Sequence, residues 1–151
     1  TRIIVNERID VAIESAAHGV HLRGDSMPAA RVRGVVRKPM VIGRSVHHPG
    51  EAGSVAASGH LDYLIFGSVF EPRSKRSESV AGTGMLSRAC ASVALPVLAV
   101  GGITVDRLPA IAGAGAAGFA AISLFADPAV DALASLVEEA IRTFDTPRCL
   151  P

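Results

Sequence analysis

The sequence has few aromatic residues and almost no net charge, and both shortages argue against nucleic-acid binding. Aromatic residues make up 4% of the chain and tryptophan is absent, so few rings are available to stack on bases. The 15 Lys and Arg residues are balanced by 14 Asp and Glu residues, which leaves a formal charge of +1. Such a chain has no basic field to hold a phosphate polymer, and we expect no nucleic-acid partner.

Long apolar runs and cysteine patterns are absent as well. No run approaches the roughly 18 uninterrupted apolar residues of a membrane-spanning helix, so we expect no membrane contact. The two cysteines, Cys90 and Cys149, have neither the spacing of metal ligands nor that of a disulfide framework, which favours a cytoplasmic protein. No two histidines have ligand spacing on one expected element, so we expect no metal site.

Small apolar residues are abundant, since the chain has 25 alanines and 15 glycines and is 49% hydrophobic. Short apolar runs alternate with segments whose apolar residues recur at helical spacing, which is typical of βα units. The predicted strands are Arg2–Val5, Gly19–Leu22, Met40–Val46, Tyr63–Gly67, Val97–Gly101 and Gly118–Ser123. The predicted helices are Ile9–Ala17, Pro28–Val36, Pro49–Ser58, Gly84–Val93, Val105–Ala114 and Pro128–Phe144. Most of the predicted strands are continuously apolar, which predicts that they are buried on both faces.

Units of roughly 25 residues favour an α/β fold of the (β/α)8 TIM-barrel type. An open doubly wound sheet is the alternative, but its glycine-rich dinucleotide motif is missing between the first strand and helix. Six of eight βα units are visible, and 151 residues fall short of the roughly 200 that a closed eightfold barrel needs. We therefore expect the N-terminal two units to be missing from this chain.

The expected domain organisation follows from this unit count. Residues 1–145 form a partial barrel of units three to eight, and residues 146–151 form a C-terminal tail. A six-unit arc leaves two strand edges open, and open edges invite pairing with another chain. The missing units would come from another chain, which favours a homo-oligomer, or from a longer protein.

Polar residues follow the expected strands, at the end of a barrel that carries the active site. They are Asn6 after the first strand, His21 in the second, Ser45 and His47 at the third, and Lys75 after the fourth. An imidazole can take and return a proton near neutral pH, so His47 is the main acid/base candidate; the alternative is a histidine that caps the next helix. Lys75 either binds an anion from its loop or is simply solvated.

The last two strands end in residues that could receive a phosphate. Gly101 and Gly102 follow one strand, and Ile122 and Ser123 end the other. Backbone amides and helix N-termini at such positions can bind a phosphate without a basic side chain. The alternative is that the paired glycines merely permit a tight turn.

Taken together, these strand-end motifs resemble those of the thiamin-phosphate synthase superfamily, and within it the thiazole tautomerase (TenI-type) branch. The matching stretches cover nearly the whole chain, and they are specific in combination and order. They are residues 5–12, 19–22, 42–47, 62–70 and 99–104, and the segment that ends in Ile122–Ser123.

The resemblance implies a (β/α)8 barrel that binds a small molecule, a thiazole phosphate. Its phosphate would be held at the positions of Gly101, Gly102, Ile122 and Ser123. The segment 42–47 looks most like the tautomerase branch, an isomerase that aromatises a carboxythiazole phosphate tautomer and needs no cofactor. That branch's acid/base histidine matches His47. The expected substrate-binding residues are Ser45, Lys75, Asn6 and His21.

The synthase branch is the main alternative, a transferase that joins a pyrimidine pyrophosphate to the thiazole phosphate. In that branch two aspartates hold a magnesium pyrophosphate, and here the matching positions are Glu7 and Ser26, with Asp25 shifted by one residue. Loss of a carboxylate weakens a magnesium site, so the sequence favours the tautomerase. A third alternative is a catalytically silent member that binds thiazole phosphate or thiamin phosphate.

Overall fold

The computed structural model describes residues 1–36, 38–71 and 80–145, in which parallel strands alternate with helices. The strands are β1 (Ile4–Asn6), β2 (Gly19–Leu22), β3 (Val41–Val46), β4 (Tyr63–Phe66), β5 (Val97–Val100) and β6 (Gly118–Ala120). The α-helices are α1 (Ile9–Glu14), α2 (Ala29–Val35), α3 (Pro49–Ala56), α4 (Gly82–Ala91), α5 (Leu108–Gly113), α6 (Ser123–Ala126) and α7 (Leu133–Asp145). Two 3-10 turns, η1 (Val105–Arg107) and η2 (Val130–Ala132), precede α5 and α7.

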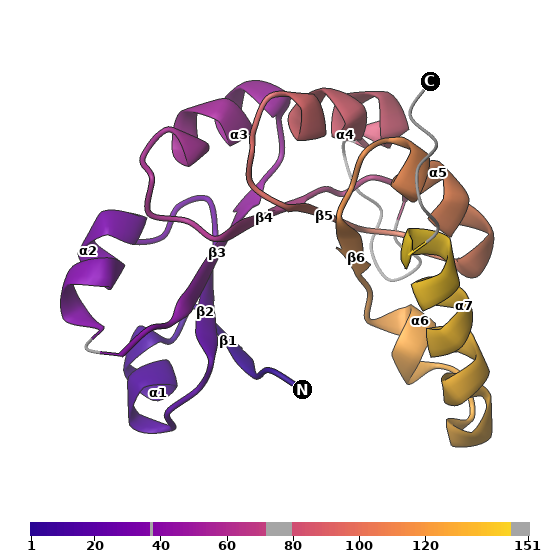
Figure 1. Cartoon of the computed structure of the whole chain (residues 1–151), viewed down its shortest axis with the longest axis horizontal. Helices are drawn as coiled ribbons and strands as arrows, with labels where there is room; N and C mark the ends of the chain where they lie inside the picture. Colours follow the sequence, from indigo (N-terminus) through magenta and orange to yellow (C-terminus); the bar gives the residue numbers. More distant parts are fainter. Residues whose placement is uncertain (37, 72–79, 146–151) are drawn as a thin grey trace.

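The six strands form one parallel sheet in chain order, from β1 to β6. Figure 1 shows that this sheet curls into an arc, with the helices on its outer side and the first and last strands at opposite ends. The expected βα alternation is thereby confirmed. The part of the chain that the structure describes is a half-barrel of six strands, and a closed ring of eight strands is not seen in it.

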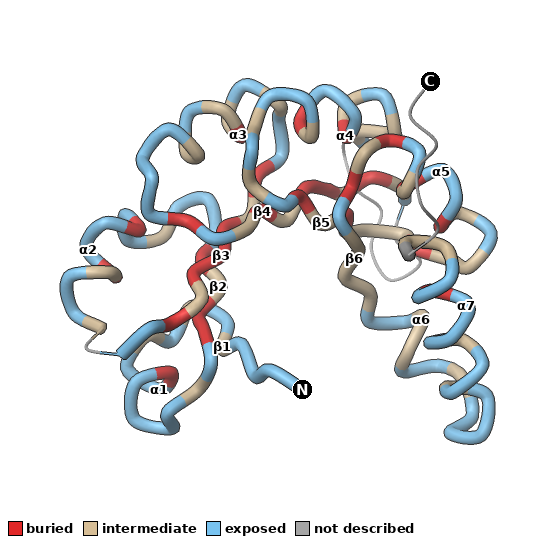
Figure 2. The backbone as a smooth tube through the Cα atoms, viewed as in Figure 1, coloured by how far each residue is buried: buried red, intermediate tan, exposed pale blue. Residues whose placement is uncertain are grey.

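The core lies between the sheet and the outer helices. Paired residues of neighbouring parallel strands project to the same face of the sheet and form rows across it. Leu22, Leu64 and Val97 form one such row with Arg44, and all four are buried. Figure 2 shows the buried positions following the strands around the arc. The neighbouring row on the inner face includes His21 and is only partly buried. Our expectation that these strands are buried on both faces is therefore wrong for this half-barrel.

Two boundaries near the C-terminus also differ from the prediction. The last strand ends at Ala120 rather than Ser123, because the chain turns at Ile122 into the short helix α6. The single helix expected at Pro128–Phe144 is replaced by η2 and α7. The Asp127–Pro128 pair is typical of a helix start, but Asp127 is the C-cap of α6.

Within the described ranges, no helix is long and apolar enough to cross a bilayer.

Candidate functional site

Polar residues gather in two regions of the molecule. We call His21, Ser45 and Tyr63 the His21 cluster; His21 and Ser45 each lie one residue before the end of β2 and β3, and Tyr63 is the first residue of β4. We call the hollow between the loops after β5 and β6 the β5–β6 cavity. The β5–β6 cavity lies at the carboxyl edge of the sheet, where parallel α/β folds place their ligands, and the His21 cluster lies on the inner face of the sheet.

The side chains of the His21 cluster form a chain of hydrogen bonds across three strands. His21 Nε2 lies 2.9 Å from Ser45 Oγ, and His21 Nδ1 lies 3.1 Å from the Tyr63 hydroxyl. The His21 and Tyr63 rings also stack, with centroids 5.6 Å apart. Gly43 makes room for this arrangement, since a Cβ at that position would lie 2.0 Å from Tyr63 Cζ. The sequence identified His21 and Ser45 but missed Tyr63, whose position is fixed by the missing side chain of Gly43.

Burial tunes the protonation of this cluster. It lowers the pKa of His21, so the imidazole is neutral at pH 7. It also raises the pKa of Tyr63, with a further contribution from the charge of Asp62, so the phenol keeps its proton. A neutral imidazole has one donor nitrogen and one acceptor nitrogen. The two hydroxyls therefore contact opposite sides of a group that can pass a proton between them.

Glu7 and Ser26 form a second polar contact next to the cluster. Glu7 Oε1 accepts hydrogen bonds from the Ser26 hydroxyl and from the Arg23 amide, the latter at 2.6 Å. These bonds, that of Ser26 first, lower the pKa of Glu7, so the carboxylate is ionised at neutral pH. Buried Arg44 holds the loop after β2 that contains Ser26. Its guanidinium donates to the carbonyls of Gly24 at 3.0 Å and Met27 at 2.6 Å.

His47 lies just beyond β3, and its side chain is exposed. Its Nδ1 lies 2.5 Å from the carbonyl oxygen of Gly67, and a carbonyl only accepts, so Nδ1 carries the proton. The alternative role of His47 as a helix cap is wrong, because the neighbouring His48 caps α3 by accepting from the Gly50 amide at 3.2 Å. No hydrogen bond joins His47 to the His21 cluster within the described ranges.

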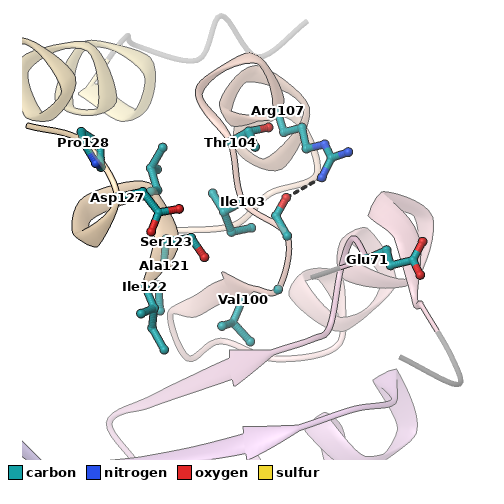
Figure 3. A pocket seen from close by; sticks show the side chains of 14 residues that line it. Glu71, Val100, Ile103, Thr104, Arg107, Ala121, Ile122, Ser123, Asp127 and Pro128 are labelled. Atoms are coloured by element: carbon teal, nitrogen blue, oxygen red, sulfur yellow. Dashed lines mark hydrogen bonds between the residues drawn. The ribbon is translucent and has the colours of Figure 1, made fainter. Parts of the chain in front are cut away.

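The β5–β6 cavity has a volume of about 470 Å³ and brings together the four residues expected to hold a phosphate. Gly101, Gly102, Ile122 and Ser123 all line it, as Figure 3 shows for the labelled side chains. Gly101 and Gly102 have φ angles of 96° and 60°, which side chains rarely adopt. The paired glycines thus make a turn, and that turn also forms a wall of the cavity.

Four polar residues of the cavity were not among the predicted site residues. Glu71 comes from the segment after β4, Arg107 and Thr104 come from the segment after β5, and Asp127 follows α6. The Thr104 hydroxyl is buried and has no hydrogen-bond partner among the described residues. Their contacts depend on how these loops fold over one another, and spacing along the chain gives no signal for that.

The remaining predicted site residues lie apart from these contacts or cannot be placed. Asn6 ends β1 next to His21 in the sheet register, and it is exposed. Lys75 lies outside the described residues.

The family model for thiamine monophosphate synthase, TMP-TENI, matches residues 1–125 of this chain. The chain belongs to this family. It is 40% identical over 124 residues to a thiamine-phosphate synthase of Salinibacter ruber, covering 82% of this chain and 54% of that protein. It is 38% identical over 129 residues to a putative thiamine-phosphate synthase of Geobacter sulfurreducens, covering 84% of this chain and 60% of that protein.

A solved structure of the same family has a similar fold. The thiamine phosphate pyrophosphorylase from Pyrococcus furiosus superimposes with a TM-score of 0.77 at 34% identity, covering 93% of this chain and 66% of that one. The chain thus spans 54% and 60% of the two sequence relatives named above.

These relatives correct our expectation of a thiazole tautomerase, an isomerase with His47 as its acid/base. That expectation is wrong, because the similar proteins are named thiamine-phosphate synthases, which are transferases. The superfamily is right, and the TenI-type branch is not supported. The physical reason lies in segment 42–47, since Arg44 is buried and holds a loop. A residue that serves the fold does not distinguish the two reactions.

Proposed function

We propose that this chain carries thiamine-phosphate synthase chemistry, in which a pyrimidine pyrophosphate is joined to a thiazole phosphate and pyrophosphate leaves. The observation that carries the proposal is the position of the His21 cluster and the β5–β6 cavity. The cluster lies on the inner face of one parallel sheet and the cavity at its carboxyl end, in a chain 40% identical to a thiamine-phosphate synthase. The cluster suits the reacting rings, and the cavity suits the phosphate of the thiazole phosphate.

The β5–β6 cavity is proposed to hold the phosphate of the thiazole phosphate. The backbone at Gly101 and Gly102 can approach an anion closely because neither residue has a side chain. Ile122 and Ser123 line the facing wall at the start of α6. Phosphate held there would fix the position of the thiazole ring, and fixed orientation lowers the entropic barrier to a reaction between two bound molecules.

The His21 cluster is proposed to face the reacting rings. The Ser45 hydroxyl, which contacts His21 Nε2, can donate to or accept from the polar edge of a pyrimidine. Tyr63 orients the imidazole from its other side. Asn6 and Lys75 remain proposed substrate-binding residues, and His47 is proposed to support the loop at Gly67.

The resemblance implies magnesium for the synthase reaction, and the residues present fit a two-carboxylate magnesium site poorly. Glu7 offers an ionised carboxylate, but its Oε1 already accepts two hydrogen bonds. The second position is Ser26, a neutral hydroxyl. Within the described part of the chain, no three His, Cys, Asp or Glu side chains are grouped to hold a metal. We therefore assign the chemistry only to the protein groups named above.

The proposal is tested by supplying the chain with pyrimidine pyrophosphate and thiazole phosphate and measuring thiamin phosphate by mass spectrometry. We expect product with wild-type protein, and about 100-fold less with the His21→Asn variant, because a group that moves or orients a proton is lost. Ser58→Ala, an exposed change after α3, is the matched control and keeps wild-type turnover. Binding of thiazole phosphate with no product under any condition would support the silent-member alternative and contradict the proposal.

A further inference from the structure

Arg107 lies in η1 beside the β5–β6 cavity, and it makes two contacts that lock its guanidinium in place. Its Nη1 donates to the carbonyl of Gly102 at 2.5 Å, the contact drawn as a dashed line in Figure 3. Its Cζ lies 4.6 Å from the centroid of the Phe70 ring, within the range of a cation–π interaction. The hydrogen bond and the ring contact use different parts of the same planar group.

The contact to Gly102 completes a pattern along the loop after β5. The carbonyl of Val100 accepts from the Val69 amide at 2.8 Å, and that of Gly101 accepts from the Phe70 amide at 3.1 Å. Arg107 then engages the third consecutive carbonyl, that of Gly102. Carbonyl oxygens repel an anion and amide hydrogens attract it, so a loop with its carbonyls bound elsewhere is suited to present amides.

The bond to Gly102 also fixes the direction of the next amide. In a trans peptide the carbonyl of one residue and the N–H of the next point in opposite directions. When Arg107 holds the Gly102 carbonyl, the Ile103 N–H therefore faces away from Arg107. No backbone hydrogen bond from the Gly102 or Ile103 amide is found among the described residues. Gly102 needs this restraint, because a residue without a side chain rotates easily.

We propose that Arg107 is a positioning residue, which fixes the Gly102–Ile103 peptide so that the Ile103 amide faces a phosphate group in the β5–β6 cavity. Phe70 holds the guanidinium flat while it does so. This proposal rests on the proposed function, since it deepens the phosphate assignment of the cavity. The role depends on the planar shape of the group as well as on its charge.

The first test measures binding of inorganic phosphate by the full chain, followed through backbone amide signals in NMR. We expect Arg107→Gln to weaken binding roughly tenfold, the effect of losing a charge-assisted hydrogen bond. Arg107→Lys keeps the charge but loses the planar fork. It is expected to recover less than half of the phosphate-binding free energy that Arg107→Gln loses. Arg88→Gln removes an exposed charge on α4, outside the cavity lining, and binds as wild type.

Two results would overturn the positioning role in this test. Wild-type affinity in Arg107→Lys would show that charge alone is enough, and wild-type affinity in Arg107→Gln would show that the residue does not matter. A milder variant, Phe70→Leu, keeps both charge and hydrogen bond and removes the ring. It is expected to weaken phosphate binding about threefold, and an unchanged affinity would contradict the part assigned to Phe70.

The second test needs no phosphate and separates this proposal from the proposed function. In the free protein, Arg107→Gln is expected to broaden the amide signals of Gly102 and Ile103 while the rest of the spectrum is unchanged. Sharp signals at both residues would overturn the restraint by Arg107. Wild-type protein that shows no shift with phosphate would instead overturn the phosphate assignment of the cavity.

Discussion

The His21 cluster and the β5–β6 cavity belong to one sheet, yet they are built from different atoms. The cluster consists of three side chains on neighbouring strands. Two of these side chains, His21 and Tyr63, can titrate. The cavity is walled by loops whose glycines turn their backbone toward it. A change that shortens a side chain therefore damages the first region, and a change that adds one damages the second.

Glycine is used for opposite purposes in the two regions. At Gly43 the missing side chain makes room for the Tyr63 ring, so the glycine serves a neighbouring side chain. At Gly101 a Cβ would lie 2.6 Å from the Cβ of Ser68, so the glycine lets two loops approach each other. The same residue type thus helps to build a side-chain cluster in one region and a backbone surface in the other.

The largest expected effect comes from a side chain added at Gly101. Gly101→Val places a branched residue at a φ of 96° and against Ser68, which is expected to cost about 3 kcal/mol of stability and abolish phosphate binding. Urea unfolding and a phosphate titration measure the two effects.

Gly113→Ala is the matched control for that change. Gly113 ends α5, and a Cβ there would meet nothing within 4 Å. The variant is expected to be as stable as wild type or about 0.5 kcal/mol more stable. If Gly101→Val and Gly113→Ala behaved alike, the cavity would not depend on its glycine backbone.

A smaller but sharper effect is expected from His21→Asn. This change removes the imidazole between Ser45 and Tyr63, and product formation is expected to fall about 100-fold. Phosphate affinity is expected to stay at the wild-type value, because the cavity is built by other loops. An equal loss of phosphate affinity would show that the two regions are not separate.

The pH dependence of stability gives a third comparison. Burial lowers the pKa of His21 below its ordinary value of 6.5, so the unfolded chain takes up a proton there before the folded chain does. The contribution of His21 is present in full above pH 6.5 and is lost as pH falls through the lower, folded pKa. Urea unfolding from pH 7.5 downward is expected to show this loss, and His21→Asn is expected to remove it. The same slope in both proteins would contradict the shift.

The smallest effect is expected from Ser123→Ala, which tests whether the cavity relies on its backbone. Ser123 lines the cavity and is exposed, and the change leaves its amide in place. Phosphate affinity is expected to change less than about twofold, as for most exposed substitutions. A tenfold loss would mean that the hydroxyl, and not the amide, holds the anion.

Much of the fold could be predicted because strand burial leaves a pattern in the sequence. β2 occurs at Gly19–Leu22 as predicted, since an apolar run between glycine and polar residues marks both ends. The short helix α6 was missed because it has only four residues and begins at Ser123, the residue at which the predicted strand ends. Asp127 misled for a related reason, since the Asp-Pro pair is typical of a helix start and here follows the end of one.

The site could be predicted only where backbone position decides the contact. Gly101 and Ser123 were expected together because neighbouring strand ends meet at one edge of a sheet, and both line the same cavity. Tyr63 and Arg107 were missed because their contacts depend on side-chain directions across strands and loops. The reaction was misjudged because segment 42–47 was read as a mark of the tautomerase branch, whereas Arg44 within it supports a loop.

An NMR titration of the full chain with thiazole phosphate tests most directly whether the two regions form one substrate site. The amide signals of Gly101, Gly102 and Ser123 and the ring signals of His21 are expected to shift together, with one dissociation constant. Inorganic phosphate, the control, is expected to shift only the three amides. Shifts at the His21 ring with none at the amides, or no shifts at all, would contradict the account.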